Sequence, residues 1–323
     1  MIKLMIAAVA LVMLELVYFH LADRFNIIDK PNQRSSHKTI TRRGGGVIFL
    51  FAIWLYGAFY NFHYPWFIGG ATLIALISFA DDVVSVANRY RIVVHFIAML
   101  MMFHQLGILV LDLWYVVAVA LIVCTYIINA YNFMDGINGI TGGYSLAVLV
   151  PLAIANRTIE AVDQHLIYML MISLLIFCFF NFRKQARCFA GDVGAVTIAF
   201  AVIYVVFSFI IETQNVLWIM LLVVYGVDSV LTIIHRLMLR ENIFEAHRKH
   251  VYQLMANELK IPHVGVSFIY VSVQLMISLG FIFLPINKWV YSLAVILLLC
   301  VGYVLFKKKF YHLHEDYLRA QKK

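Results

Sequence analysis

The sequence predicts an all-α, polytopic helical membrane protein. Hydrophobic residues make up 63% of its 323 positions, charged residues make up only 13%, and the mean hydropathy is +0.89. A soluble globular chain of this length does not need so much apolar surface. The apolar residues also gather in long runs, most of them long enough to cross a hydrocarbon core about 30 Å thick.

Eleven apolar segments, separated by short polar breaks, predict about eleven transmembrane helices. We expect the shorter or glycine-interrupted segments to be tilted or to span only half of the bilayer. The first segment has a lone Lys3 and no small-residue cleavage site, so it is expected to stay as an uncleaved span. In order, the segments are 2–22, 45–61, 65–80, 92–111, 113–130, 140–155, 164–181, 193–211, 215–238, 264–285 and 288–306.

Lysine and arginine are distributed unevenly between the two sets of loops. One set holds 22 of the 25, and the other holds only Lys3, Arg157 and Lys288. Because positive charge is retained on the cytoplasmic side, the rich set is predicted to be cytoplasmic, with the N-terminus outside and the C-terminus inside. The rich set comprises 23–43, 81–91, 131–139, 182–191, 236–260 and the tail 307–323.

The net charge of +8 therefore follows from topology and from attraction to anionic membrane lipids. No basic stretch is interleaved with exposed aromatic residues, so nucleic acid is not an expected partner. Residues 1–323 are predicted to form a single membrane domain, because the longest polar stretches, 23–43 and 239–262, are too short to fold alone. The four cysteines form no CxxC pair, so neither a disulfide framework nor a zinc site is expected.

Carboxylates stand where apolar segments meet the polar breaks. Asp81 and Asp82 end a span in ISFADDVVSVANRYR, and two adjacent carboxylates require a metal, an arginine or a shared proton. The alternative is a solvated helix end. Because all these breaks fall on the same predicted side of the membrane, and intramembrane carboxylates usually mark functional paths, we expect the polar residues to converge.

The most specific break is NAYNFMDGINGITGG. Here Asn129, Asn132, Asp135 and Asn138 recur every three residues, close to one face of a helical turn. Carboxylate and amide oxygens suit a hard cation such as magnesium, and amides also recognise a base or a sugar amide. Close packing of small residues would explain the glycines of this segment, but not its polar ladder.

In CFAGDVGAVTIAF, Asp192 lies between two glycines at the predicted start of a span. The free amides of a helix start attract anions, so this position suits a metal–phosphate site. Helix capping by Asp192 is the alternative. Phe189 is placed to stack on a planar base, or is an ordinary interfacial aromatic residue.

Two loops concentrate cationic side chains. RENIFEAHRKHVYQ contains His247, Arg248 and His250, which would suit a diphosphate, or would lie on an amphipathic interfacial helix. DKPNQRSSHKTITRRGGG contains Arg34, His37, Lys38, Arg42 and Arg43 before a triple glycine, as a phosphate-binding loop or as topological charge.

Together these motifs resemble the polyprenyl-phosphate N-acetylhexosamine-1-phosphate transferases of the glycosyltransferase 4 family. DKPNQRSSHKTITRRGGG, DD, NAYNFMDGINGI, GDVGA and AHRKHVYQ stand in the family's order and cover nearly the whole chain. The first and last forms look most like the O-antigen-initiating branch, and the triple-histidine loop of the muramoyl-pentapeptide branch is absent. Two positions depart from common family patterns: Ser85 replaces the last Asp of DDxxD, and Asn138 the second Asp of DGxDG.

The resemblance implies transfer of N-acetylhexosamine 1-phosphate from a UDP-N-acetylhexosamine to undecaprenyl phosphate, the first membrane step of a surface polysaccharide. It implies magnesium, with manganese as the alternative, held by Asp192 and the amide of Asn132. Asp81 and Asp82 would position or deprotonate the lipid phosphate, and Asp135 is the third catalytic carboxylate. The implied substrate-binding residues are Arg34, His37, Asn129, Asn138, Phe189, His247, Arg248 and His250.

The implied location is the bacterial inner membrane, with a multi-pass chain and an active site on the cytoplasmic face. A multi-pass transporter that uses Asp228 and Glu15 inside spans is the alternative. The sequence does not identify the hexosamine, the downstream polysaccharide or the role of Asp228. It is compatible with a homodimer without deciding the oligomeric state, and it does not separate one-step from covalent catalysis.

Overall fold

The computed structural model describes residues 1–29, 40–110, 112, 114–243, 245 and 247–321. Almost every described element is a helix, and each of the eleven predicted apolar segments contains one. The elements are α1 (Ile2–Arg24), β1 (Ile28–Asp29), β2 (Thr41–Arg42), η1 (Gly45–Val47), α2 (Ile48–Phe59), α3 (Pro65–Val84), α4 (Asn88–Gln105), α5 (Trp114–Met134), α6 (Ile140–Ile159), α7 (Gln164–Asn181), α8 (Gly191–Thr213), η3 (Val216–Leu222), α9 (Val223–Met238), α10 (Val251–Gln253), η4 (Leu254–Glu258), α11 (His263–Phe283) and α12 (Lys288–Gln321).

Eight of the described helices are long and apolar enough to cross a membrane, counting η3 with α9 as one run. The chain is therefore a multi-pass membrane protein. Three helices that fall on predicted spans, α2, α4 and α6, are not among the eight. The number eleven remains a prediction from the sequence.

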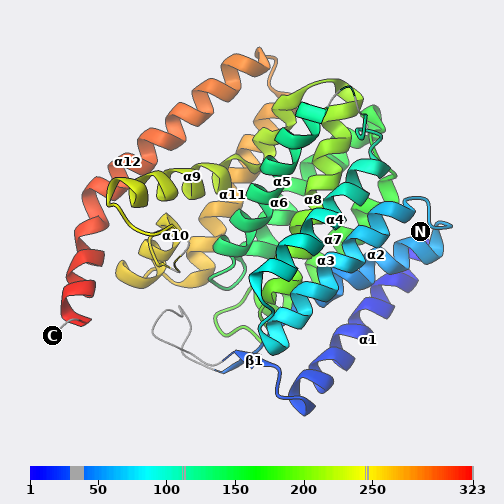
Figure 1. Cartoon of the computed structure of the whole chain (residues 1–323), viewed down its shortest axis with the longest axis horizontal. Helices are drawn as coiled ribbons and strands as arrows, with labels where there is room; N and C mark the ends of the chain where they lie inside the picture. The colour runs from blue at the N-terminus through cyan, green and yellow to red at the C-terminus, as the bar shows by residue number, and fades with distance from the viewer. Residues whose placement is uncertain (30–39, 111, 113, 244, 246, 322–323) are drawn as a thin grey trace.

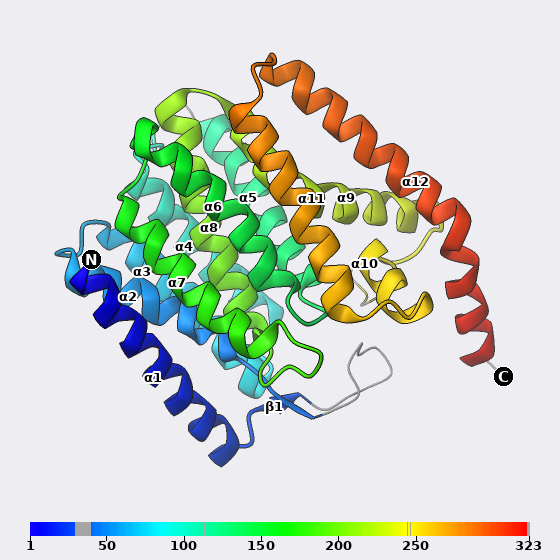
Figure 2. The ribbon, with the colours of Figure 1, turned by 180° about the vertical axis from the view of Figure 1, so that it is seen from behind.

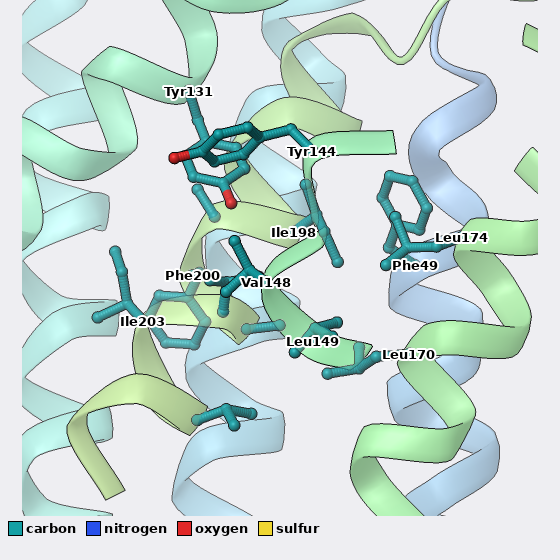
Figure 3. Close-up of a cluster of buried hydrophobic side chains, with 14 of the residues drawn as sticks. Phe49, Tyr131, Tyr144, Val148, Leu149, Leu170, Leu174, Ile198, Phe200 and Ile203 are labelled. Carbon is teal, nitrogen blue, oxygen red and sulfur yellow. The ribbon is translucent and has the colours of Figure 1, made fainter. Parts of the chain in front are cut away.

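Helix α8 forms the centre of the bundle, and 89% of its apolar window is buried. Figure 3 shows its side chains Ile198, Phe200 and Ile203 among those of α6, α7 and α2. Lipid tails are as apolar as these side chains, so close van der Waals packing, rather than transfer from water, holds such helices together. Because α8 is so closely packed, both of its ends are held in fixed positions in the bundle.

Helix α9 departs from the prediction of one straight span over 215–238. The chain runs as η3 to Leu222 and then turns, so that α9 lies across the direction of α5, α6 and α11 (Figures 1 and 2). The inward face of α9 is polar and buried, and its outward face is apolar and exposed. Such a helix suits a membrane boundary. The inward face carries Tyr225, Asp228, Ser229, Thr232 and Arg236, and the outward face carries Val230, Ile234, Leu237 and Met238.

Helix α12 continues well past the predicted span end at residue 306. Its second half packs against the segment RENIFEAHRKHVYQ (240–253), which we call the basic loop. Lys307 donates to the carbonyl of Lys249, and Arg248 Nη1 donates to Tyr317 Oη at 3.2 Å. Residues 307–321 of the predicted cytoplasmic tail are therefore helical and contact the loop. Figure 1 shows α12 as one long diagonal helix.

The described parts of all six lysine- and arginine-rich segments meet at one end of the bundle, as the sequence predicts. Direct contacts join them through Arg43–Asp82, Phe189–Arg42, Asn138–Arg183, Tyr252–Phe133 and Arg248–Tyr317. At the other end, Lys3 donates to the carbonyl of Phe59, and Tyr56 donates to Asp163. The two ends therefore differ in charge as a membrane protein's two faces do.

Labelling of single cysteines tests which membrane face carries the charged end. In a variant without the four native cysteines, we expect probes at the exposed positions Arg89, Lys184 and Lys309 to react with a membrane-impermeant maleimide only from the cytoplasm. A probe at Arg157 should react only from outside. Reaction at residues 89 and 157 from the same face would contradict the orientation.

Candidate functional site

Three carboxylates and two arginines form a compact cluster at the charged end. Asp192 lies between the arginines, with its oxygens 3.4 Å from Arg43 Nη2 and 3.2 Å from Arg91 Nη2. Arg91 also contacts Asp81 at 2.5 Å, and Arg43 contacts Asp82 at 2.6 Å. Asp81 and Asp192 therefore both contact the same guanidinium group, that of Arg91. The structure thus brings these three aspartates together around two arginines.

Asp82 holds the start of α8. Its oxygens accept the backbone N–H groups of Asp192 at 3.0 Å and Val193 at 2.9 Å, and its side chain has no exposed surface. Free amides at a helix start are satisfied by such a carboxylate. The capping role considered for Asp192 therefore belongs to Asp82, and the carboxylate of Asp192 remains partly exposed at the cluster.

Glycines allow the first loop to reach α8. Gly44 has φ +81°, and the backbone amides of Gly45 and Gly46 donate to the carbonyls of Phe189 and Ala190 at 2.9 and 3.1 Å. A Cβ on Gly46 would overlap the Cα of Gly194. The triple glycine thus allows the backbone of the first loop to approach the backbone of α8 closely. Phe189, the predicted base-stacking residue, is half-buried here.

Asp135 directly follows Met134, the last residue of α5. Its carboxylate accepts from Thr141 Oγ1 at 2.5 Å, and it lies within the electrostatic field of Asp192, Asp82 and Arg43. Burial raises the pKa of Asp135 to about 7, and the Thr141 bond opposes that rise. Near neutral pH this carboxyl group can therefore carry or release a proton.

A pH series tests the raised pKa of Asp135. Its ordinary pKa is about 4, so the neutral form favours the fold. That stability is fully present below about pH 4 and is lost as the pH rises through 7. We expect the Tm of cation-free protein to fall more steeply between pH 5 and 7.5 than the Tm of Asp135→Asn. Parallel Tm curves would contradict this.

The three asparagines of the polar ladder differ in their exposure and in their partners. Asn138 is 5% exposed and donates to the carbonyls of Arg183 at 2.9 Å and Lys184 at 3.4 Å, so it ties two loops together. Asn129 is exposed and donates to the carbonyl of Thr125 at 2.8 Å, while Asn132 is half-buried. The roles proposed for these residues towards ligands remain predictions.

A cavity of about 720 Å³ lies between α4, α5, α9 and the basic loop. Its walls are largely apolar, and all four of these elements contribute polar residues to it. Asn88 and Ile92 of α4 line it, and Arg91 between them contacts the carboxylate cluster. Cluster and cavity are thus adjacent. The other lining residues include Phe96, Leu121, Ile122, Asn129, Phe133, Ile233, Arg236, His247 and His250.

The basic loop contributes its histidines to this cavity. The rings of His247 and His250 lie 5.0 Å apart, and both face Phe133, at 6.5 and 6.4 Å. Burial, the neighbouring His250 and nearby cations lower the pKa of His247 to about 3, so its ring is neutral at pH 7. Arg248 points elsewhere, because it lies over the Tyr317 ring at 5.2 Å.

Two predicted residues, Arg34 and His37, lie outside the described part of the chain. Conversely, the sequence indicated Arg43 only as one of several basic residues of a possible phosphate-binding loop and did not assign Arg91 to the site, although both arginines organise it. Arg91 follows Asp81 by ten residues across a short break, and Arg43 directly precedes the triple glycine. Only these positions, close to the aspartates and the glycines in sequence, could have indicated that the two arginines belong to the site.

The donor chemistry is compatible with magnesium. Within the described ranges no group of three or more His, Cys, Asp or Glu residues is arranged as a complete metal cage. Magnesium usually retains water and is held by one or two carboxylates together with substrate phosphates. The partly exposed Asp192, with Asp81 beside it, fits this requirement.

The chain is similar in sequence to known membrane transferases. A model of glycosyl transferase family 4 matches residues 64–210, which include Asp81, Asp82, Asp135 and Asp192. The chain is 24% identical to an undecaprenyl-phosphate alpha-N-acetylglucosaminyl 1-phosphate transferase of Yersinia pestis, over 88% of this chain and 85% of the relative. It is 22% identical to a probable undecaprenyl-phosphate N-acetylglucosaminyl 1-phosphate transferase of Bacillus subtilis, over 88% and 84%. It is also 28% identical to a phospho-N-acetylmuramoyl-pentapeptide-transferase of Thermotoga neapolitana, over 73% and 83%.

Proposed function

Because the chain belongs to the polyprenyl-phosphate hexosamine-1-phosphate transferase superfamily, we propose that it transfers N-acetylhexosamine 1-phosphate from a UDP-sugar to undecaprenyl phosphate. One observation carries the proposal. The carboxylate–arginine cluster borders a largely apolar cavity, which His247 and His250 also line. The cluster consists of Asp81, Asp82, Asp192, Arg43 and Arg91. A charged centre beside an apolar groove suits a lipid phosphate.

The reaction joins two anions. An oxygen of the lipid phosphate attacks the sugar-bearing phosphorus, the bond from that phosphorus to the uridine phosphate breaks, and UMP leaves. Neutralising the negative charge is therefore the main catalytic task. Bound magnesium, held by Asp192 and by Asn132 from the end of α5, would supply part of that neutralisation.

The protein's own residues do the remaining work. Arg43 and Arg91 are fixed by the carboxylates and offer further N–H groups to phosphate oxygens. Asp81, anchored by the N–H of Val86 at 2.7 Å, orients the lipid phosphate or takes its proton. Asp82 supports this arrangement by holding Arg43 and the start of α8. Arg43, Arg91 and Asp82 thus hold the two reacting phosphate groups in position relative to each other.

On the donor side, Asp135 faces the nucleotide, Asn138 supports its segment by holding the 183–184 loop, Phe189 stacks on uracil, and His247 and His250 hold the sugar phosphates. The same end of the bundle is the cytoplasmic face of a bacterial inner membrane, because UDP-sugars are cytoplasmic. The relatives favour N-acetylglucosamine as the first sugar to test. An O-antigen-like polysaccharide is the proposed destination.

Transfer of radiolabel tests the function. Purified protein is incubated with undecaprenyl phosphate, magnesium and labelled UDP-sugars: N-acetylglucosamine, N-acetylgalactosamine and N-acetylfucosamine. Label should move into the lipid phase with one of them, and UMP should appear in equal amount. No labelled lipid with any sugar, under conditions where a known relative is active, would overturn the proposal.

The transporter hypothesis loses its main support. Asp228, which was to act as a coupling carboxylate, is held by His250, Tyr270 and backbone. Uptake of intact UDP-sugar into proteoliposomes without UMP formation would nevertheless favour transport.

A further inference from the structure

Four groups converge on the buried carboxylate of Asp228 in α9, which is 4% exposed. Its Oδ1 accepts from the backbone N–H of Val251 at 3.0 Å and from Thr232 Oγ1 at 3.2 Å. Its Oδ2 accepts from the Tyr270 hydroxyl at 2.6 Å. The fourth group is His250, whose Nδ1 lies 3.4 Å from Oδ1.

These contacts fix both the backbone and the ring of His250. Val251 is the first residue of α10 and His250 is its N-cap, so the bond to Val251 sets where the loop turns. The His250 ring lies between Asp228 and the rings of Phe133 and Tyr252, at 6.4 and 5.9 Å. Rotation of the ring would therefore break several contacts at once.

A carboxylate beside Nδ1 determines which nitrogen faces the cavity as an acceptor. The proton of a neutral imidazole is favoured on the nitrogen that faces a carboxylate, which leaves the lone pair on the other nitrogen. Neither ring nitrogen of His250 has a hydrogen bond of good geometry among the described residues. Nδ1 has only the 3.4 Å contact with Asp228, and Nε2 has no protein partner in a ring that lines the cavity.

We infer that Asp228 is a positioning residue: it holds the His250 ring in the Nδ1–H tautomer, with Nε2 directed to the phosphates of the bound substrates. The inference rests on the proposed function for the identity of the ligand. It assigns to Asp228 a role through His250, rather than one in helix packing or in ion coupling. Thr232 and the Val251 N–H, which bind the same oxygen that His250 contacts, in turn orient the carboxylate.

Kinetics of three variants and one double variant test this role. Asp228→Asn keeps the size of the side chain but removes its charge, and we expect transfer to fall about 10–100-fold, as for other residues that orient a functional histidine. In the His250→Ala background the same change should alter transfer less than about twofold, because Asp228 acts through that ring. Losses that multiply would overturn the inference.

Tyr270→Phe is the matched control. It removes the bond to the other carboxylate oxygen, Oδ2, and leaves the contact with His250 in place. We expect it to lower Tm about as much as Asp228→Asn does, with a loss of transfer of less than about threefold. Equal losses of transfer in these two variants would mean that Asp228 only stabilises the fold.

A second readout does not depend on the reaction. In protein labelled with ¹⁵N-histidine, the imidazole signals of His250, assigned by their absence from His250→Ala, should report the Nδ1–H tautomer. In Asp228→Asn they should shift to the Nε2–H form. This result can hold even if no UDP-sugar is transferred, which separates the inference from the proposed function. Identical His250 signals in both proteins would refute it.

Discussion

Replacing Asp192 with asparagine is expected to lower sugar-phosphate transfer by at least about 10²–10³-fold, the scale for losing one electrostatic group at a reaction centre. Asp192 is the carboxylate that both Arg43 and Arg91 contact, and it is the proposed magnesium ligand. Asparagine keeps the shape but removes the charge that holds the two arginines. Measured at saturating UDP-sugar, the loss should appear mainly in kcat.

Asp163→Asn is the matched control for this prediction. Asp163 also stands at a helix start, where it accepts from the backbone of His165 at 2.9 Å and from the Tyr56 hydroxyl at 2.8 Å. It lies at the opposite end of the bundle, so its loss of charge should leave transfer unchanged within about twofold. Transfer by Asp192→Asn at the wild-type rate in limiting magnesium would remove Asp192 from the reaction centre.

Gly46→Ala is expected to cause the second large effect, on folding as well as on transfer. An added Cβ would overlap the backbone of Gly194 and approach the carbonyl of Ala190. Neither can rotate away as a flexible side chain can, so the loop and α8 must separate. Overpacking of this kind costs about 1–3 kcal/mol or more. A lowered Tm, with transfer lost at temperatures where protein remains folded, is the expected result.

Gly302→Ala is the control for added volume. A Cβ at Gly302 of α12 would meet no atom within 4 Å, and alanine favours a helix by up to about 1 kcal/mol over glycine. Tm should therefore stay the same or rise. If Gly46→Ala behaves like Gly302→Ala, the loop does not pack on α8 as tightly as described.

Apolar run length was enough to place every helix that builds the bundle. Hydropathy reports burial in lipid or protein, so it predicted segments such as 193–211, now the buried α8. It could not predict the turn at Leu222, because η3 and α9 together read as one continuous apolar run. The direction of α9 depends on which face is polar, and the polar residues there bind partners distant in sequence.

The site was predictable as a set of carboxylates, but their separate tasks were not. Asp81, Asp82 and Asp192 look alike in sequence, each at a helix end. Only the fold shows that Asp82 is buried under two backbone amides while Asp192 faces two arginines. Asn138 likewise fitted a ligand-binding ladder, yet its amide donates to the carbonyl of Arg183.

The arginine pair of the cluster has a consequence for how the protein is made. Arg91 and Asp192 are 101 residues apart, which at typical synthesis rates of 5–20 residues per second separates their emergence from the ribosome by about 5–20 s. Arg43, Arg91, Asp81 and Asp82 are all synthesised before Asp192, and together these four residues carry no net charge. Asp192 then adds the one carboxylate that makes the cluster negative. The complete cluster can therefore form only after the start of α8 has been synthesised.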